Sequence, residues 1–250
     1  MKKNIAEKFV PTSVRRWLQI QKVHLWKLQP FRHVRFGNLR RLTPISRVFG
    51  FDRGLPIDRY YIEAFLEKYA NDIKGNVLEI GDDSYTRKFG GIRVSRSEVL
   101  HAIPGNPQAT IVGDLETGAG IPQEAFHCMI LTQTLLFIYD VKAAIANCYT
   151  TLKPGGVLLA TFPGISQISR YDMDRWGDYW RFTTLSARRL FEDVFPAENV
   201  NVQSHGNVLI AIAFLHGLAT QELKQKELEY HDSDYQVLIT VRAVKPKLRE

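Results

Sequence analysis

The sequence lacks the clustered residues that build disulfide frameworks and zinc sites. Only Cys128 and Cys148 are cysteines among its 250 residues, they lie far apart, and neither belongs to a CxxC pair or a histidine cluster. Because such sites need several ligands close together, we predict no disulfide framework and no metal. With 45% hydrophobic residues, the chain can instead bury an ordinary hydrophobic core.

Long hydrophobic runs are also missing. The longest, residues 208–215, is far shorter than the roughly 20 residues that cross a bilayer. Residues 1–8 are basic but lack the apolar core of a secretory signal. We therefore expect a cytoplasmic protein.

Acidic residues are scarce in the first part of the chain. Residues 1–59 hold 14 Lys and Arg against 3 Asp and Glu, a net charge of +11, whereas the rest of the chain carries −4. Apolar residues at helical spacing over 14–28 predict an amphipathic helix that ends before Pro30. We therefore divide the chain into a basic N-terminal extension with this helix, residues 1–50, and a domain of residues 51–250.

Three roles for this extension stay open. It can pack on its own domain, dock on an anionic membrane or a partner such as a glycosyltransferase, or bind nucleic acid. Nucleic acid is the least favoured, because aromatic residues such as Trp17 lie on the apolar side of the helix rather than among the arginines. A membrane contact would place the protein at the inner membrane face.

From residue 58 onward, helical and extended patterns alternate. Helices are predicted over 59–71, 141–152 and 208–223. Short apolar runs predict strands at residues 77–80, 92–94, 110–112, 127–131, 157–161, 200–203 and 236–244. Apolar strands alternating with helices are typical of a mostly parallel sheet covered on both faces. We therefore predict an α/β, Rossmann-like fold with a seven-stranded, mostly parallel sheet whose last pair contributes an antiparallel strand.

Polar residues follow the predicted strands at their carboxyl ends, where open α/β sheets bind ligands. Gly81 and Asp82 follow the first strand, Glu98 the second, Asp114 the third and Gln133 the fourth. Acidic groups after three consecutive strands suit a ligand with ribose hydroxyls, an exocyclic amine and a positive charge. They suit a pyrophosphate poorly, because like charges repel.

The loop in the stretch VLEIGDDSY is poor in glycine. Dinucleotide-binding loops contain several glycines, because the backbone must approach a pyrophosphate closely. Here one glycine, Gly81, is followed by Asp82 and Asp83. Aspartate tolerates left-handed backbone better than most residues, so Asp83 can stand where glycine is expected. We interpret the loop as a working ligand site; a merely structural loop is the alternative.

Five features occur in a characteristic order: VLEIG, an acidic residue after the second strand, GDL after the third, FHCMILTQTLLFIYD and LKPGGVLLATFPG. Over residues 51–245 this pattern resembles the class I S-adenosylmethionine-dependent methyltransferases. The stretches FDRGLPIDRYYIE, GDDSYTRKFGG and DRWGDYWRFT are similar, more narrowly, to methyltransferases found with bacterial polysaccharide-biosynthesis and glycosyltransferase genes.

The resemblance implies S-adenosylmethionine as the cofactor and assigns its methionine end to the first loop. Gly81 and Asp82 would lie under that end, Glu79 would orient the loop, and Gln133 would lie nearby. The carboxylates of Asp82 and Asp83 would then face the cofactor's ammonium group, to which they are attracted.

The resemblance also assigns the other parts of the cofactor. Glu98 would bind the two ribose hydroxyls, although aspartate is the commoner residue there. Asp114 would accept from the adenine amino group, beside the backbone of Leu115. Apart from the resemblance, residues 52–61 precede the first core helix and could cover the cofactor. Arg53 or Arg59 could then meet the methionine carboxylate, with a structural role next to that helix as the alternative.

The loop after the fifth strand, residues 164–183, is rich in aromatic, acidic and basic residues. Such a mixture is typical of sugar sites, because sugar faces stack on rings and hydroxyls bond to charged groups. A lid that closes over the cofactor is the alternative. Methylating a hydroxyl needs a base, and our candidates are Asp172, Asp174 and His205.

We therefore predict a methyltransferase that acts on a small-molecule or glycan acceptor, by O-methylation of a sugar or polysaccharide precursor. Two alternatives stay open: a non-catalytic scaffold of a glycan-assembly complex, and a nucleic-acid methyltransferase. Residues 132–135, TQTL, differ from the Asn-Pro-Pro-Tyr type of motif, which argues against base-amine methylation in the manner of the DNA enzymes.

Overall fold

The computed structural model describes residues 37–247 of the chain. The chain divides into two compact units, Met1–Leu42 and Thr43–Glu250. The described part of the first unit contains a short 3-10 helix, Gly37–Leu39, and the helix predicted over 14–28 lies outside the described residues. Residues 43–50, which we grouped with the extension, lie in the second unit.

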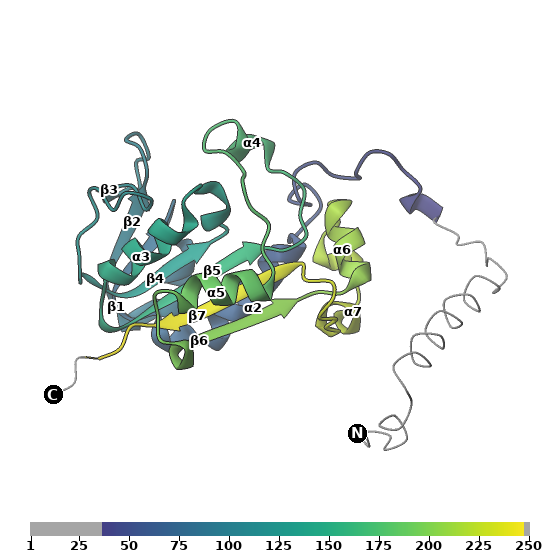
Figure 1. The fold of residues 1–250 in the computed structure, drawn as a ribbon. Helices are drawn as coiled ribbons and strands as arrows, with labels where there is room; N and C mark the ends of the chain where they lie inside the picture. Colours follow the sequence, from purple (N-terminus) through teal and green to yellow (C-terminus); the bar gives the residue numbers. More distant parts are fainter. Residues whose placement is uncertain (1–36, 248–250) are drawn as a thin grey trace, which may run out of the picture. The chain divides into compact units, whose positions relative to one another are not determined.

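The second unit is built on a seven-stranded sheet in the order β3-β2-β1-β4-β5-β7-β6 (Figure 1). Strands β1 to β5 pair in parallel, and β7 runs antiparallel to both of its neighbours, β5 and β6. The predicted fold class is thereby confirmed. The strands are β1 (Gly75–Ile80), β2 (Val94–His101), β3 (Ile111–Val112), β4 (Phe126–Thr132), β5 (Leu152–Pro163), β6 (Val200–His205) and β7 (Leu238–Val244).

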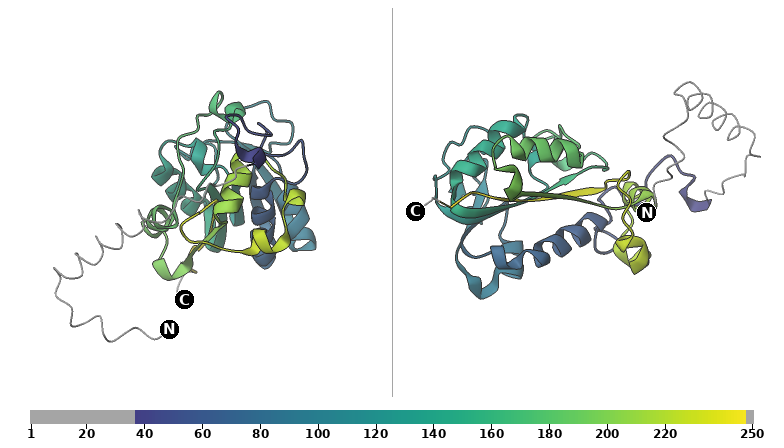
Figure 2. Two further views of the ribbon diagram at one scale, coloured as in Figure 1. Left: turned by 90° about the vertical axis from the view of Figure 1, so that its right-hand side faces the viewer. Right: turned by 60° about the horizontal axis from the view of Figure 1, so that its bottom comes forward.

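Helices cover both faces of this sheet, which Figure 2 (right) shows nearly edge-on. Successive residues of a strand point to opposite faces, so in β4 Cys128 belongs to one hydrophobic core and Met129 to the other. The Cys128 core includes α2 (Ile57–Lys68), α6 (Val208–Leu215) and α7 (Gln225–Glu229). The Met129 core includes α3 (Val141–Thr151) and α5 (Thr184–Glu192). Burial on both faces explains why residues 128–131 of β4 form a continuous apolar run.

The second strand lies later in the chain than predicted. We placed it at residues 92–94 and read the following polar residues as a loop, but β2 spans Val94–His101. Strand β3 pairs only with Leu100 and His101, so the first half of β2 is an open edge of the sheet. Polar side chains are tolerated at such an edge, which is why a polar stretch forms a strand here.

The predicted helix over 208–223 is also shorter. Helix α6 ends at Leu215, and Gly217 then takes a φ of +69°, a left-handed conformation that glycine adopts without strain. A separate 3-10 helix, Thr220–Glu222, follows. None of the helices in residues 37–247 combines the length and the apolar character needed to cross a membrane.

Candidate active site

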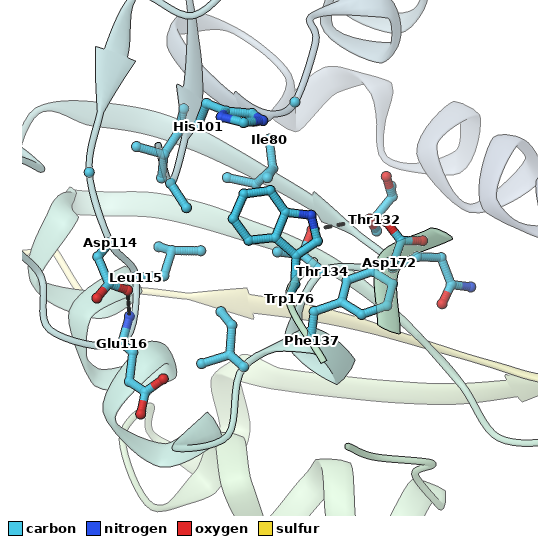
Figure 3. A pocket seen from close by; sticks show the side chains of 16 residues that line it. Ile80, His101, Asp114, Leu115, Glu116, Thr132, Thr134, Phe137, Asp172 and Trp176 are labelled. Atoms are coloured by element: carbon cyan, nitrogen blue, oxygen red, sulfur yellow. Dashed lines mark hydrogen bonds between the residues drawn. The ribbon is translucent and has the colours of Figure 1, made fainter. Parts of the chain in front are cut away.

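A pocket of about 360 Å³ opens at the carboxyl ends of β1 to β4, on the edge where the sequence predicted a ligand site (Figure 3). This volume lies in the range of small-molecule sites. The strand order sets the lining residues in a row: Asp114 follows β3, His101 ends β2, Gly81 follows β1 and Gln133 follows β4. An elongated ligand can therefore lie across the ends of four strands.

Gly81 opens the floor of the pocket. Its φ is +85°, so a side chain there would be strained, and a Cβ would meet no described atom within 4 Å. The backbone is thus free to contact a ligand directly. Asn106 holds this loop from the next connection, because its Nδ2 donates to the Gly81 carbonyl at 2.6 Å. Left-handed backbone is confined to Gly81 in the stretch 81–85, so Asp83 needs no special conformation.

Glu79 is hydrogen-bonded to the segment that follows the Gly81 loop. Its two carboxylate oxygens accept from the backbone N–H groups of Thr86 at 2.7 Å and Tyr85 at 3.2 Å. Burial raises the pKa of Glu79 to about 7, against the effect of these hydrogen bonds, which favour the charged form. Glu79 does not line the pocket and acts through the loop that it holds.

Asp114 and Leu115 present an acceptor beside a donor. The Asp114 carboxylate is fixed by hydrogen bonds from the Glu116 N–H at 2.8 Å and the Thr117 hydroxyl at 3.0 Å. Each of its oxygens keeps a further lone pair. No described residue accepts from the backbone N–H of Leu115. This pairing suits the edge of an aminopurine, which has an amino group next to a ring nitrogen.

Glu98 does not reach the pocket, which corrects the role implied for it. It lies inside β2, opposite Leu78 of β1, three residues before the end of the strand. Its carboxylate pairs with Arg96 and is almost fully buried. His101 ends β2 instead and lines the pocket. Its Nδ1 lies 2.8 Å from the Ile103 carbonyl, which can only accept, so this nitrogen carries the proton and Nε2 is the acceptor when the ring is neutral.

The charge of the pocket favours a cationic ligand. Three carboxylates line it, those of Asp114, Glu116 and Asp172, and among the described residues no lysine or arginine does. A pyrophosphate would be repelled, whereas a sulfonium or an ammonium group would be attracted. Gln133 adds an amide and has a φ of +50°, a conformation that non-glycine residues adopt rarely and mostly at functional sites.

A second pocket, of about 490 Å³, adjoins the first. The two share Thr132, Gln133, Phe137 and Asp172. We call them the inner and the outer pocket. The outer pocket is lined by residues 47–49 and Phe51, by Asp58 and Arg59, and by the loop after β5. Asp172 thus stands at the junction, where the Ser169 hydroxyl donates to its Oδ2 at 2.6 Å and leaves Oδ1 available.

Three other predicted site residues lie outside both pockets. Asp82 is exposed and accepts from the Ser84 N–H at 2.8 Å, which makes it part of a turn. Asp174 is exposed and lies 3.8 Å from Arg170. His205 stacks on Tyr61, with ring centroids 5.3 Å apart.

The buried position of His205 also explains its low pKa. It ends β6, at the far side of the sheet from the inner pocket, and burial lowers its pKa to about 4.

The two candidate arginines differ in their surroundings. The guanidinium of Arg53 pairs with Glu222. Arg59 lines the outer pocket and is the arginine of the two that remains near the site.

The loop after β5 brings an aromatic residue that the sequence analysis did not single out. Trp176 lines the inner pocket, with its ring edge-on to His101 at 5.7 Å between centroids. Figure 3 shows the indole between His101 and Phe137, with Asp114 and Asp172 on opposite sides. The signal was the aromatic content of DRWGDYWRFT, but which ring enters the pocket depends on how the loop folds.

Comparison with known proteins agrees with this arrangement. Residues 64–160 match the sequence model of a family described as a methyltransferase domain. No curated protein matches the chain. The structure resembles a SAM-dependent methyltransferase from Archaeoglobus fulgidus, with a TM-score of 0.50 and 11% identity over 75% of this chain and 94% of that chain. It also resembles Haemonchus contortus phosphoethanolamine N-methyltransferase 2 in complex with S-adenosyl-L-methionine, with a TM-score of 0.51 and 14% identity over 85% of this chain and 55% of that chain.

At these identities the solved structures establish the fold, which is the Rossmann-like methyltransferase fold. The matched domain indicates methyl transfer, and the anionic pocket at the strand ends suits a cationic cofactor. Together they support an S-adenosylmethionine-dependent methyltransferase, with S-adenosylmethionine as its cofactor.

Proposed function

We propose that the protein transfers a methyl group from S-adenosylmethionine to an oxygen of a sugar or polysaccharide precursor. The observation that supports this most directly is the position of Asp172, a carboxylate shared by the inner and outer pockets. The inner pocket has the charge and volume for the cofactor, and the outer pocket has room for an acceptor. Asp172 would then take the proton that leaves the acceptor hydroxyl.

The residues of the inner pocket fit the parts of the cofactor in strand order. The Asp114 carboxylate and the Leu115 N–H would hold the adenine, and His101 would meet the ribose in place of Glu98. Gly81 and Gln133 would contact the methionine end, and its carboxylate would face Arg59 of the outer pocket. The bound cofactor supplies an electrophilic methyl group on a cationic sulfur. Acidic walls and the Trp176 indole would hold that charge and exclude water.

The outer pocket supports a hydroxylated acceptor. Its lining combines the Tyr171 ring with charged groups of both signs, including Arg47 and Arg170. A sugar can stack one face on a ring and direct its hydroxyls to such groups. Asp172 would accept the proton from the reacting hydroxyl through its available Oδ1. We place this reaction in the cytoplasm, with residues 1–50 as the contact to the inner membrane face or to a glycosyltransferase.

The acceptor class is tested with S-adenosylmethionine labelled in its methyl group. The full chain is incubated with nucleoside-diphosphate sugars, short oligosaccharides, RNA and DNA, and the methylated atom is located by mass spectrometry. We expect label on a sugar oxygen. Label on nucleic acid alone, or none on any acceptor by a protein that binds S-adenosylhomocysteine, would contradict the proposal.

Replacing Asp114 with alanine tests the cofactor site separately. We expect the affinity for S-adenosylhomocysteine, measured by calorimetry, to fall by about 10- to 100-fold, because a charge-assisted hydrogen bond contributes about 1.5–3 kcal/mol. The matched control is Asp82→Asn, which alters the exposed carboxylate outside the pocket and should change affinity less than twofold, a difference of roughly 0.4 kcal/mol. Equal effects of the two substitutions would mean that the ligand lies elsewhere.

A further inference from the structure

Helix α6 has an exposed apolar face. Val208, Leu209, Ile212 and Leu215 are 46%, 40%, 38% and 43% exposed, and they fall on one stripe of the helix. The residues between them, Ile210, Ala211, Ala213 and Phe214, are buried in the core. Single exposed apolar residues are ordinary, but four on two turns of one helix form a patch.

The patch continues along the chain that enters the second unit. The N–H groups of Ile45 and Ser46 donate to the His216 carbonyl, just after α6, at 2.9 and 3.0 Å. Phe49 packs on Phe214, and Val48 and Phe51 are 50% and 59% exposed. Figures 1 and 2 show α6 and residues 43–51 at the same end of this unit. We call Val48, Phe51 and the four exposed residues of α6 the apolar rim.

The apolar rim borders the outer pocket. Val48, Phe51 and Phe214 line that pocket, and so does the exposed Arg47. Whatever covers the rim therefore lies beside the proposed acceptor site. An acceptor that is anchored in the covering surface could enter the outer pocket without leaving it.

Charge identifies the covering surface. Residues 31–47, which lead into the rim, contain five arginines and no acidic residue, with apolar residues between them. An apolar patch that directly follows an arginine-rich segment in the chain matches an anionic bilayer, where rings and aliphatic groups enter the headgroup region and arginines meet lipid phosphates. A protein partner would not require this uniform positive charge.

We propose that the apolar rim binds an anionic membrane surface and thereby presents the outer pocket to a sugar acceptor carried on a lipid. The membrane contact stands on the apolar rim and on the basic segment, residues 31–47, that precedes it in the chain. The lipid-borne acceptor rests, in addition, on the proposed function.

The test uses the full chain and vesicles of phosphatidylglycerol and phosphatidylcholine in equal parts, with pure phosphatidylcholine vesicles for comparison. We expect the wild type to bind the anionic vesicles about tenfold or more tightly than the neutral ones in flotation. The variant Leu209→Ser/Ile212→Ser should lose about tenfold or more of this binding. Ile92→Ser, which alters an isolated and fully exposed apolar residue, is the control and should bind as the wild type does.

Three results would overturn the membrane contact. The first is absence of vesicle binding by the wild type, and the second is equal binding by the rim variant. The third is a wild-type dimer in light scattering that is lost in the rim variant, while the wild type binds no vesicles. Calorimetry with S-adenosylhomocysteine verifies that each variant folds. If vesicle binding follows the expectation but no sugar is methylated, the proposed function fails and the membrane contact stands. If the rim variant methylates a sugar acceptor on vesicles as well as the wild type does, and equally well in solution, the lipid-borne acceptor is contradicted.

Discussion

Replacing Asp172 with asparagine should lower the rate of methyl transfer by about 10²- to 10⁴-fold, the contribution typical of a general base. The substitution keeps the size of the side chain, and its amide oxygen can still accept from the Ser169 hydroxyl, which donates to Asp172 Oδ2 at 2.6 Å. It removes the ability to take a proton. Because Asp172 stands at the junction of the two pockets, the affinity for S-adenosylhomocysteine should change by no more than about fivefold, roughly 1 kcal/mol.

Asp174→Asn is the matched control for this experiment. Asp174 lies in the same loop two residues later, was predicted from the sequence as a base, and is an exposed partner of Arg170 at 3.8 Å. Exposed pairs of this kind contribute about 0–1 kcal/mol, so both rate and affinity should stay close to the wild type. A normal rate in Asp172→Asn, or an equal loss in both variants, would remove Asp172 from its role. Single-turnover rates are the measurement, because they separate chemistry from product release.

The sequence predicted the fold because its strands are set by local pattern. The central residues of β1, β4 and β5 are buried on both faces and, apart from Glu79 in β1, mainly apolar. A short window of sequence detects such a run. Strand β2 was misplaced because its first half is an edge whose polar residues resemble a loop. Its position is fixed by pairing with β1, a contact between residues about 20 apart in the chain, such as Leu78 and Glu98.

The site was predictable to the extent that it consists of strand ends. Gly81, Asp114, Leu115 and Gln133 follow correctly placed strands, and the structure brings all four to the inner pocket. Glu98 followed the misplaced strand and was assigned to the wrong position for that reason. Because β2 lies later in the chain than predicted, Glu98 lies inside the strand rather than after its end. Its carboxylate is buried there and does not reach the pocket.

The remaining site residues depend on contacts that no local pattern records. Asp172 and Trp176 come from one long loop, and nothing in their spacing distinguishes them from Asp174 or Trp180. His205 was a reasonable candidate because histidine is the commonest base, but it lies against Tyr61 at the other side of the sheet. The fold of the loop 164–183 therefore decides which of its side chains reach the pockets.

A buried ion pair holds this loop in place. The Asp178 side chain is 0% exposed and that of Arg181 is 26% exposed. The guanidinium Nη2 donates to Asp178 Oδ2 at 3.1 Å and to the Gln167 carbonyl at 2.8 Å, so it connects both ends of the loop. Asp178 also accepts from the backbone N–H of Ser169 at 3.2 Å, and the hydroxyl of the same Ser169 donates to Asp172. The pair thus links the fold of the loop to the position of the proposed base.

Asp178→Ala should release this loop and, with it, the activity. Removing one partner of a buried pair costs about 3–5 kcal/mol, and we expect roughly 3 kcal/mol because Arg181 keeps some contact with water. This corresponds to about 100-fold faster amide hydrogen exchange in residues 164–183 where exchange proceeds by local opening, with β4 and β5 protected as in the wild type. Methyl transfer should fall at least tenfold, since Asp172 and Trp176 are then no longer held over the pockets.

Glu192→Ala is the control for the loss of an ion pair as such. Glu192 pairs with Arg188 at 3.3 Å on the surface of α5, four residues apart, and its removal should cost about 0.3–0.5 kcal/mol. Unchanged exchange in residues 164–183 of Asp178→Ala would show that the loop is held by its backbone contacts, such as that between the Tyr179 N–H and the Leu136 carbonyl at 3.0 Å. Faster exchange with a normal rate of methyl transfer would instead mean that the chemistry does not require the ordered loop, and Asp172 would lose its place as the base.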